Sequence, residues 1–314
     1  MFYGSFIMHI NTREGFLKSK YDDLDISYLE IYPDNPKATL QLVHGMCEYK
    51  ERYIPFMTYL AENGYACIIH DHRGHGKSVK KKEDLGYFYL GMADGVLSDI
   101  GLVSDRLYED FPGLKHGLFG HSMGSLAVRA YAKKHDENLS ALIVCGSPSE
   151  NRFSGLMSKF DDALIRRKGD HARSELINSA FLGFFQKNFL DEKLDNAWIC
   201  SDRAVVEKYN ADEYCNFTFT LNGYKSLLSL MELAYSHEST RPRNPKLPVL
   251  FVSGADDPCM VTKKDFAKAV KSFADNGYTN VSSKLYPGMR HEILNEKQRL
   301  CVYSDILKYL DNHM

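Results

Sequence analysis

The stretch Leu118-Phe119-Gly120-His121-Ser122-Met123-Gly124-Ser125 has the pattern Gly-x-Ser-x-Gly, and it lies between an apolar run and a helix-forming run over 126–132. Strand, sharp turn and helix around this pattern are typical of a nucleophile elbow, in which a strained turn presents the serine Oγ at the top of a sheet. Glycines at 120 and 124 fit this interpretation, because a side chain at either position would meet the helix that follows Ser122. The alternative is a serine that caps a helix between two glycines.

Length and charge restrict the class of protein. With 314 residues the chain is long enough to bury a full core and long for one minimal domain, so we expect an α/β domain that carries an insertion. The formal net charge is -2, from 39 Lys+Arg and 41 Asp+Glu. This balance provides no electrostatic basis for nucleic-acid binding, and a nucleic-acid partner is not expected.

Cysteine usage and the first residues indicate the compartment. The seven cysteines are scattered, odd in number and without Cys-x-x-Cys spacing, which argues against a disulfide framework or a structural zinc site. Residues 1–10 lack the basic and apolar regions of a signal peptide, and no window approaches the ~20 apolar residues of a spanning helix. We therefore expect a cytoplasmic protein.

The chain alternates between strand and helix patterns over much of its length. Segments 6–10, 16–21 and 26–31 are expected to form antiparallel edge strands, with breaks at Arg13-Glu14-Gly15 and Asp22-Asp23. Continuously apolar runs then alternate with helix patterns, which predicts a mostly parallel sheet covered by helices on both faces. The predicted strands are 38–43, 66–69, 117–119, 142–145, 249–252 and 281–286, and the predicted helices include 54–62, 92–110, 263–273 and 296–310.

The alternation stops after Pro148 for about ninety residues, and the pattern becomes one of helices joined by polar loops. We therefore predict an inserted helical cap at 148–240 and an α/β core formed by 1–147 and 241–314. Ile177, Phe181, Phe185 and Phe189 recur at steps of four, which predicts one helix with an aromatic face. Such a face lines an acyl tunnel, rests against lipid or, most commonly, packs in a core.

Polar residues follow two of the later strands. A serine hydroxyl needs a base to accept its proton, and the base needs an acid to orient it. Because loops at the carboxyl ends of parallel strands converge, the partners of Ser122 should follow strands. His291 follows the strand 281–286, while Asp256 and Asp257 both follow the strand 249–252.

The segment Asp71-His72-Arg73-Gly74-His75-Gly76-Lys77-Ser78 has histidines in a glycine-rich loop, a pattern that also occurs at zinc sites. No further ligand cluster accompanies it. We expect a structural loop held by hydrogen bonds of Asp71, Arg73 and Ser78.

Together with the elbow, these loops resemble the α/β-hydrolase superfamily along nearly the whole chain. The motifs His44-Gly45-Met46-Cys47-Glu48-x-x-x-Arg52-Tyr53 and Gly120-His121-Ser122-Met123-Gly124 look like those of the monoacylglycerol lipase and lysophospholipase group. Related epoxide hydrolases and dehalogenases carry an aspartate at the elbow, so Ser122 indicates acyl transfer to water. Tyr49 departs from the group, which usually has histidine there, and Met46 replaces a smaller residue at the oxyanion position.

The resemblance implies roles for individual residues. The order Ser122, Asp257, His291 matches the triad of the fold, and Asp257 is preferred because it stands three residues after Gly254 and before a proline. Asp256 is then a turn residue or a helix N-cap. The backbone N–H groups of Met46 and Met123 are expected to form the oxyanion hole, each contributing ~3 kcal/mol. His44 and His121 are interpreted as loop-bracing residues without a proton-transfer role, and no metal, nucleotide or other cofactor is required.

The resemblance implies a serine carboxylic-ester hydrolase that cleaves monoacylglycerol- or lysophospholipid-like esters through an acyl-enzyme. Short-chain or aromatic esters, and the chemistry of prolyl-type aminopeptidases or carbon–carbon bond hydrolases, are alternatives on the same scaffold. A non-catalytic ligand-binding protein is the alternative of a different class. The expected partner is a small acyl ester; a transient lipid contact through the cap stays open, although Arg166-Arg167-Lys168 and Arg173 are more simply a solvated basic turn.

Overall fold

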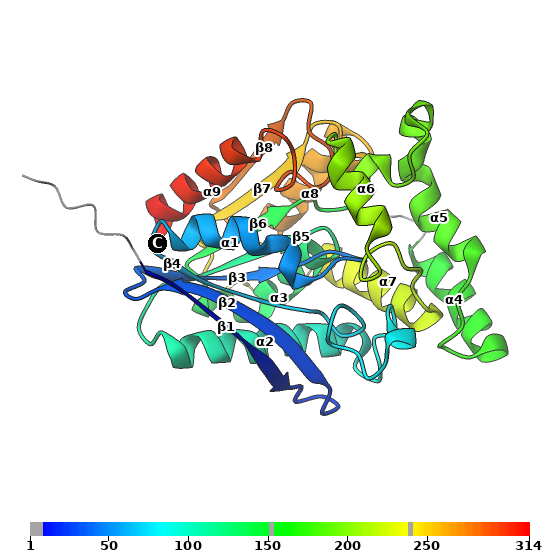
Figure 1. The fold of residues 1–314 in the computed structure, drawn as a ribbon, viewed down its shortest axis with the longest axis horizontal. Helices are drawn as coiled ribbons and strands as arrows, with labels where there is room; N and C mark the ends of the chain where they lie inside the picture. Colours follow the sequence, from blue (N-terminus) through cyan, green and yellow to red (C-terminus); the bar gives the residue numbers. More distant parts are fainter. Residues whose placement is uncertain (1–8, 151–153, 238–240) are drawn as a thin grey trace, which may run out of the picture.

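The computed structural model describes residues 9–150, 154–237 and 241–314, and its centre is one eight-stranded sheet (Figure 1). The strand order is β1-β2-β4-β3-β5-β6-β7-β8. The pairs β1–β2 and β2–β4 are antiparallel, and every later pair in this order, from β4–β3 to β7–β8, is parallel. The predicted mostly parallel α/β architecture is confirmed. The strands are β1 (Ile10–Lys18), β2 (Asp25–Pro33), β3 (Ala38–Val43), β4 (Tyr65–His70), β5 (His116–His121), β6 (Ala141–Cys145), β7 (Val249–Gly254) and β8 (Val281–Tyr286).

Helices cover both faces of the sheet. One apolar core joins the sheet to α1 (Ile54–Ala61) and α9 (Arg299–His313). A second core, on the other face, joins it to α2 (Met92–Asp110), α3 (Met123–His135) and α8 (Lys263–Asp275) (Figure 1). Every residue of the five strands from β3 to β7 is buried, which explains why these strands are continuously apolar rather than alternating.

The first strand differs from its prediction. β1 runs through Arg13-Glu14-Gly15, where we expected a break, and the chain turns only after Lys18. Arg13 lies opposite Glu30 of β2 and pairs with it, and the ring of Tyr28 fills the space that a side chain at Gly15 would need. These cross-strand contacts outweigh the turn tendency of glycine. Residues 6–8 of the predicted segment 6–10 lie outside the described residues.

The segment between β6 and β7 is helical. It contains α4 (Ser154–Lys168), α5 (Glu175–Gln186), α6 (Arg203–Ala211) and α7 (Leu221–Tyr235), which lie together at one end of the molecule in Figure 1. The predicted stripe of four residues on one helix is wrong at its last position, because α5 ends at Gln186 and Phe189 has a non-helical φ of -127°. In the described ranges, no helix is both long enough and apolar enough to cross a membrane.

The loop after β4 is held by buried charges. The Arg73 guanidinium donates to Asp99 and Asp22 at 2.9 Å each, and also to the Ser19 hydroxyl. Asp71 accepts from the Lys50 and Lys77 N–H groups, and the Ser78 hydroxyl donates to the Asp71 carbonyl. The loop is therefore pinned by the side chains of Asp71, Arg73 and Ser78, the three that the sequence indicates.

We expect Asp99→Asn to destabilise the fold by about 3 kcal/mol, because it removes charge compensation from the fully buried Arg73. The measurement is the free energy of unfolding by urea. Asp105→Asn on the same helix breaks only the exposed ion pair with Lys20 and should cost less than about 1 kcal/mol. Equal losses in the two variants would contradict the role assigned to the buried pair.

Candidate active site

Ser122 occupies a strained turn between β5 and α3. Its φ of 53° and ψ of -118° lie where a side chain is rarely accommodated. A Cβ at Gly120 would lie 2.4 Å from the Gly124 carbonyl oxygen, so this glycine lets the strand approach the helix, as predicted. A Cβ at Gly124 would instead lie 2.2 Å from the carbonyl oxygen of Val43, at the end of β3. The strain at Ser122 is consistent with a site held in place by the packing around it.

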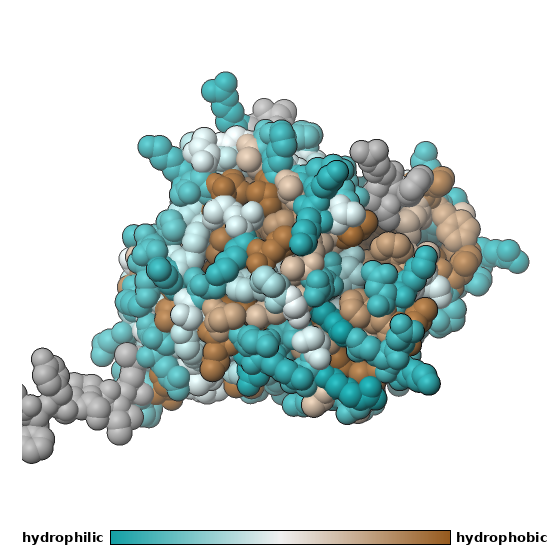
Figure 2. Space-filling model, turned by 90° about the horizontal axis from the view of Figure 1, so that it is seen from above, coloured by the Kyte–Doolittle hydropathy of each residue, from teal (hydrophilic) through white to brown (hydrophobic). Residues whose placement is uncertain are grey.

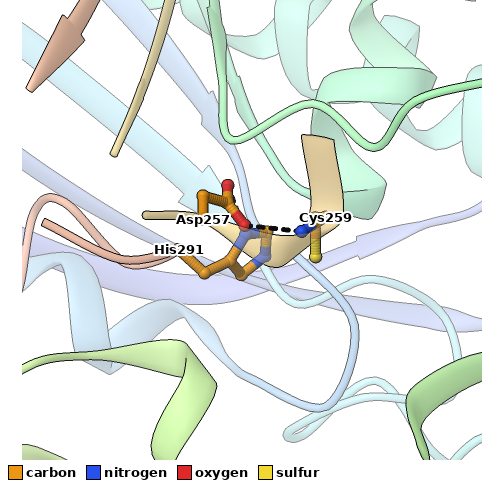
Figure 3. Close-up of side chains that lie close together, drawn as sticks. All are labelled: Asp257, Cys259 and His291. Carbon is orange, nitrogen blue, oxygen red and sulfur yellow. Dashed lines mark hydrogen bonds and ion pairs between the residues drawn. The ribbon is translucent and has the colours of Figure 1, made fainter. Parts of the chain in front are cut away.

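His291 and Asp257 are brought together by the loops that follow β8 and β7. The Nδ1 atom of His291 lies 3.0 Å from Asp257 Oδ2, and both side chains are buried (Figure 3). The carboxylate also accepts from the Ser253 hydroxyl at 2.8 Å and from the Cys259 N–H at 2.9 Å. Burial alone would raise the pKa of Asp257, but the neighbouring His291 and these hydrogen bonds outweigh it and lower the pKa. An ionised Asp257 places the proton of His291 on Nδ1 and leaves Nε2 to accept another.

Asp256 is placed differently from its neighbour. Asp256 lies in a turn with its side chain exposed, and its backbone N–H donates to the Met289 carbonyl of the next loop at 3.0 Å. The predicted alternative of an N-cap at Asp256 is wrong, because Asp257 caps the short 3₁₀ helix Pro258–Met260. Asp257 alone of the two acids contacts His291.

Asp257, Cys259 and His291 also have ligand atoms within 4.8 Å of one another, a spacing compatible with a metal ion (Figure 3). Both oxygens of Asp257 already accept hydrogen bonds from protein donors. Burial, with the charge of Asp257, raises the pKa of the Cys259 thiol and disfavours the thiolate that a metal needs. The arrangement therefore suits orientation of His291 better than metal binding.

A cavity of about 360 Å³ collects the predicted site residues. Ser122, His291, Met46 and Met123 all line it, although Ser122 Oγ and His291, both described, share no hydrogen bond. Catalytic hydrogen bonds are often long without substrate and tighten when it binds. Met123 is the first residue of α3, so its N–H has no partner within the helix.

Histidine side chains hold the loop that carries Met46. His75 Nε2 accepts the Cys47 N–H at 3.3 Å, and His44 Nε2 accepts the His72 N–H at 2.9 Å. Burial lowers the pKa of His44 and His72, and it lowers that of His75 to about 4, so these rings are neutral near pH 7. The Cys47 N–H is thus occupied, whereas the Met46 N–H makes no hydrogen bond to any described residue.

A buried ionic network joins the three loops of the site. Glu48 Oε1 accepts from the Gly45 N–H, from the Tyr53 hydroxyl at 2.9 Å and from His121 Nδ1 at 2.9 Å. Arg52 donates to Glu48 at 3.0 Å and binds Glu292 with two hydrogen bonds of 2.7 Å. The network thus connects the loop of Gly45 and Met46, the turn at Ser122 and the residue next to His291.

Charge pairing sets the protonation states in this network. Burial would raise the pKa of Glu48, but the charges of His121 and Arg52 lower it to about 2. Burial would lower the pKa of His121, but Glu48 raises it. From the sequence we assigned His121 a bracing role but did not predict the ionic network. The spacing of four between Glu48 and Arg52 was a signal for it, because this spacing suits an ion pair on a helical turn.

The segment between β6 and β7 reaches the end of the core that carries Ser122 and His291. Trp198, the single tryptophan, lies with its ring centroid 5.1 Å from that of His291. The Glu292 N–H donates to the Ile199 carbonyl at 2.7 Å, and Arg290 donates to the Ala197 carbonyl at 2.6 Å. This anchoring of the His291 loop depends on contacts between residues about ninety positions apart, which no local pattern reveals.

The cavity lining is largely apolar, and its polar part includes the acids Glu48, Asp195 and Glu292 as well as several amides. Apolar side chains come from both the core and the helical segment: Met46, Met123, Phe181, Leu182, Phe185, Phe217, Leu227 and Met231. Side-chain amides come from the helical segment alone: Asn178, Gln186, Asn196 and Asn216. A mostly apolar cavity with a few amides suits a ligand that has a hydrocarbon part and a part with hydroxyl groups.

Comparison with known proteins identifies relatives along most of the chain. The family described as Serine aminopeptidase, S33 matches residues 34–298. A monoacylglycerol lipase from Mycolicibacterium smegmatis is 26% identical over 286 residues, which cover 90% of this chain and 91% of that protein. The phospholipase YtpA of Bacillus subtilis is 23% identical over 284 residues, 90% of this chain and 98% of that protein. A thermostable carboxyl esterase from Bacillus coagulans, solved with glycerol, superposes with a TM-score of 0.89 at 25% identity, over 96% and 98% of the two chains.

We expect the stability to fall in acid through His75. Its pKa of about 4 in the fold lies below the ordinary value near 6.5, so the unfolded chain binds more protons in this window. The contribution of His75 to the free energy of unfolding is complete above about pH 6.5. It falls by on the order of 3 kcal/mol as the pH drops towards about 4. Urea unfolding across this range measures it.

His75→Gln keeps an acceptor for the Cys47 N–H but does not titrate, and it should flatten this part of the pH profile. His9→Gln, at an exposed histidine, is the control and should leave the profile unchanged. A His75→Gln profile as steep as that of the wild type would refute the assignment.

Proposed function

The chain belongs to the serine hydrolase family described as Serine aminopeptidase, S33, and from this premise we propose that Ser122, His291 and Asp257 are its catalytic triad. It is a serine hydrolase of ester bonds, as its lipase and esterase relatives indicate, which is contrary to the non-catalytic alternative. One observation carries the triad proposal. Ser122, on its strained turn, lines the same cavity as His291, and the His291 ring is held from behind by the buried Asp257.

The proposed reaction proceeds through an acyl-enzyme. Ser122 Oγ attacks the ester carbonyl while His291 Nε2 takes its proton, and the ionised Asp257 stabilises the imidazolium that forms. The N–H groups of Met46 and Met123 donate to the oxyanion, and each is worth ~3 kcal/mol of barrier. His291 then protonates the leaving alcohol, and a water molecule, activated by the same nitrogen, releases the acid.

The proposed substrates are long-chain monoacylglycerols or similar single-chain esters such as lysophospholipids. The apolar side chains of the cavity suit the acyl chain, and the amides of Asn178, Gln186 and Asn196 suit glycerol hydroxyls. Gln186 Oε1 is buried without a hydrogen-bond partner, so a ligand hydroxyl would satisfy it. The M. smegmatis relative is named for monoacylglycerol and the B. subtilis relative for phospholipid.

We also propose that residues 148–240 act as the cap of this enzyme and that it works in the cytoplasm. The placement of Trp198 against His291, and of Phe181 and Phe185 in the cavity wall, supports a cap that shapes the acyl site. A vesicle-binding measurement tests whether the cap also contacts lipid surfaces.

Asp257→Asn should lower kcat by about 10⁴, because His291 loses the acceptor that fixes its tautomer. Asp256→Asn is the matched control: it changes the adjacent, exposed acid in the same way and should leave kcat within about twofold. Hydrolysis of p-nitrophenyl esters measures both.

Ser122→Ala should abolish turnover and labelling by a fluorophosphonate, and wild-type turnover in that variant would exclude Ser122 as the nucleophile.

A chain-length series tests the substrate proposal. With monoacylglycerols from butanoyl to hexadecanoyl, kcat/KM should rise about fourfold for each added methylene until the apolar part of the cavity is full. Fastest turnover of the shortest esters would favour the short-chain esterase instead. Faster turnover of proline anilides than of any ester would assign the chain to the aminopeptidases.

A further inference from the structure

A second cavity lies within the helical segment, outside the proposed catalytic site. It measures about 380 Å³ and is bordered by α4, α5 and α7. We call it the cap groove. Leu156 and Phe160 of α4 and Leu176 of α5 line it and are exposed, which opens the groove to solvent. Figure 2 shows apolar, brown surface among hydrophilic residues at this end of the molecule.

One carboxyl group interrupts this apolar lining. Asp161 is 1% exposed, and neither of its side-chain oxygens has a hydrogen-bond partner. The adjacent Asp162 differs, because it pairs with Lys225 of α7 and is partly exposed. A buried carboxyl group without a donor is costly, and protein structures rarely leave one unsatisfied.

The charges around Asp161 do not compensate it. Burial and then Asp162 raise its pKa to about 7, and Lys225 lowers the pKa only in part, since that ammonium is bound to Asp162. Tyr224 of α7 faces the groove, but its hydroxyl donates to Asn178 at 2.6 Å. From α5 the groove receives apolar side chains only: Leu176, Ile177, Ala180 and Phe181. Above neutral pH the wall of the groove therefore contains a buried negative charge that no neighbouring group compensates.

The cap groove is separated from the catalytic cavity by a wall of side chains. Phe181 and Tyr224 stack with their ring centroids 4.9 Å apart, and Asn178 is fixed by the hydroxyl of Tyr224. Phe181 contacts both cavities, whereas Asp161 lines only the groove. A ligand in the groove would thus occupy a site distinct from that of the ester.

We propose that the cap groove binds a single-chain amphiphile with a primary ammonium head group. Its alkyl chain would lie on Leu156, Phe160 and Leu176, and its ammonium would donate to Asp161. An ammonium group supplies both the charge and the hydrogen bonds that this carboxylate lacks. A carboxylate head group would meet a like charge, and a hydroxyl group would leave the charge uncompensated.

Calorimetric titration of the full chain with decylamine, decanol and decanoate below their micelle concentrations, at about pH 8, tests the proposal. Decylamine should bind saturably and about tenfold or more tightly than decanol, with decanoate weakest. Binding of decylamine should weaken about tenfold from about pH 8 to about pH 6, because Asp161 gains a proton while the amine stays charged. Similar affinities for the three compounds, or an affinity for decylamine that does not change with pH, would overturn it.

Two variants locate the site. Asp161→Asn should weaken decylamine binding about tenfold and leave decanol unchanged, whereas Glu175→Gln, a control at an exposed acid of α5 beside the groove, should change decylamine binding less than about twofold. Equal effects of the two variants would place the amine elsewhere. The wild-type pH dependence gives an independent answer if either variant fails to fold, and neither measurement depends on the identity of the ester substrate.

Discussion

The strained backbone at Ser122 is the constraint on which the rest of the site depends. A serine with a φ of 53° persists only where its surroundings leave no relaxed alternative. Here the Ser122 N–H donates to the Cys145 carbonyl of β6 at 2.9 Å, and Gly120 and Gly124 let the turn pack against α3 and the end of β3 without a side chain between them. The parallel sheet therefore fixes the direction of the serine hydroxyl.

A buried ionic network links the loops around Ser122. Glu48 contacts the loop of Met46 through Gly45 and the turn at Ser122 through His121. Through Arg52 it is also linked to Glu292, beside His291. Buried charges of this kind are tolerated only when they are paired and hydrogen-bonded. Glu48, directly or through Arg52, connects all three loops. A shift of one loop would therefore leave Glu48, Arg52 or Glu292 as a buried charge without its partner, and this cost holds the loops in fixed relative positions.

The helical segment between β6 and β7 contributes in two ways. On its inner side, Trp198 and the Ile199 carbonyl hold the His291 loop, and Phe181 and Phe185 line the cavity. On its outer side, the same segment forms an apolar groove around the unpaired Asp161. Phe181 lines both the proposed acyl site and the groove, so this side chain separates the two cavities.

The sequence by itself determined the parallel sheet, the helical excursion after Pro148 and the placement of Ser122, Asp257 and His291 after strands, because these follow from local hydrophobic periodicity and from motifs of fixed spacing. It misplaced the break in β1, where the contact of Gly15 with Tyr28 decides, and it extended the helix α5 too far, to Phe189. Only the tertiary structure decided how Glu48 and Arg52 join the loops and that Asp161 is buried without a partner. Each of these depends on contacts between residues distant in the chain, and burial and pairing of charge are properties of such contacts rather than of any local pattern.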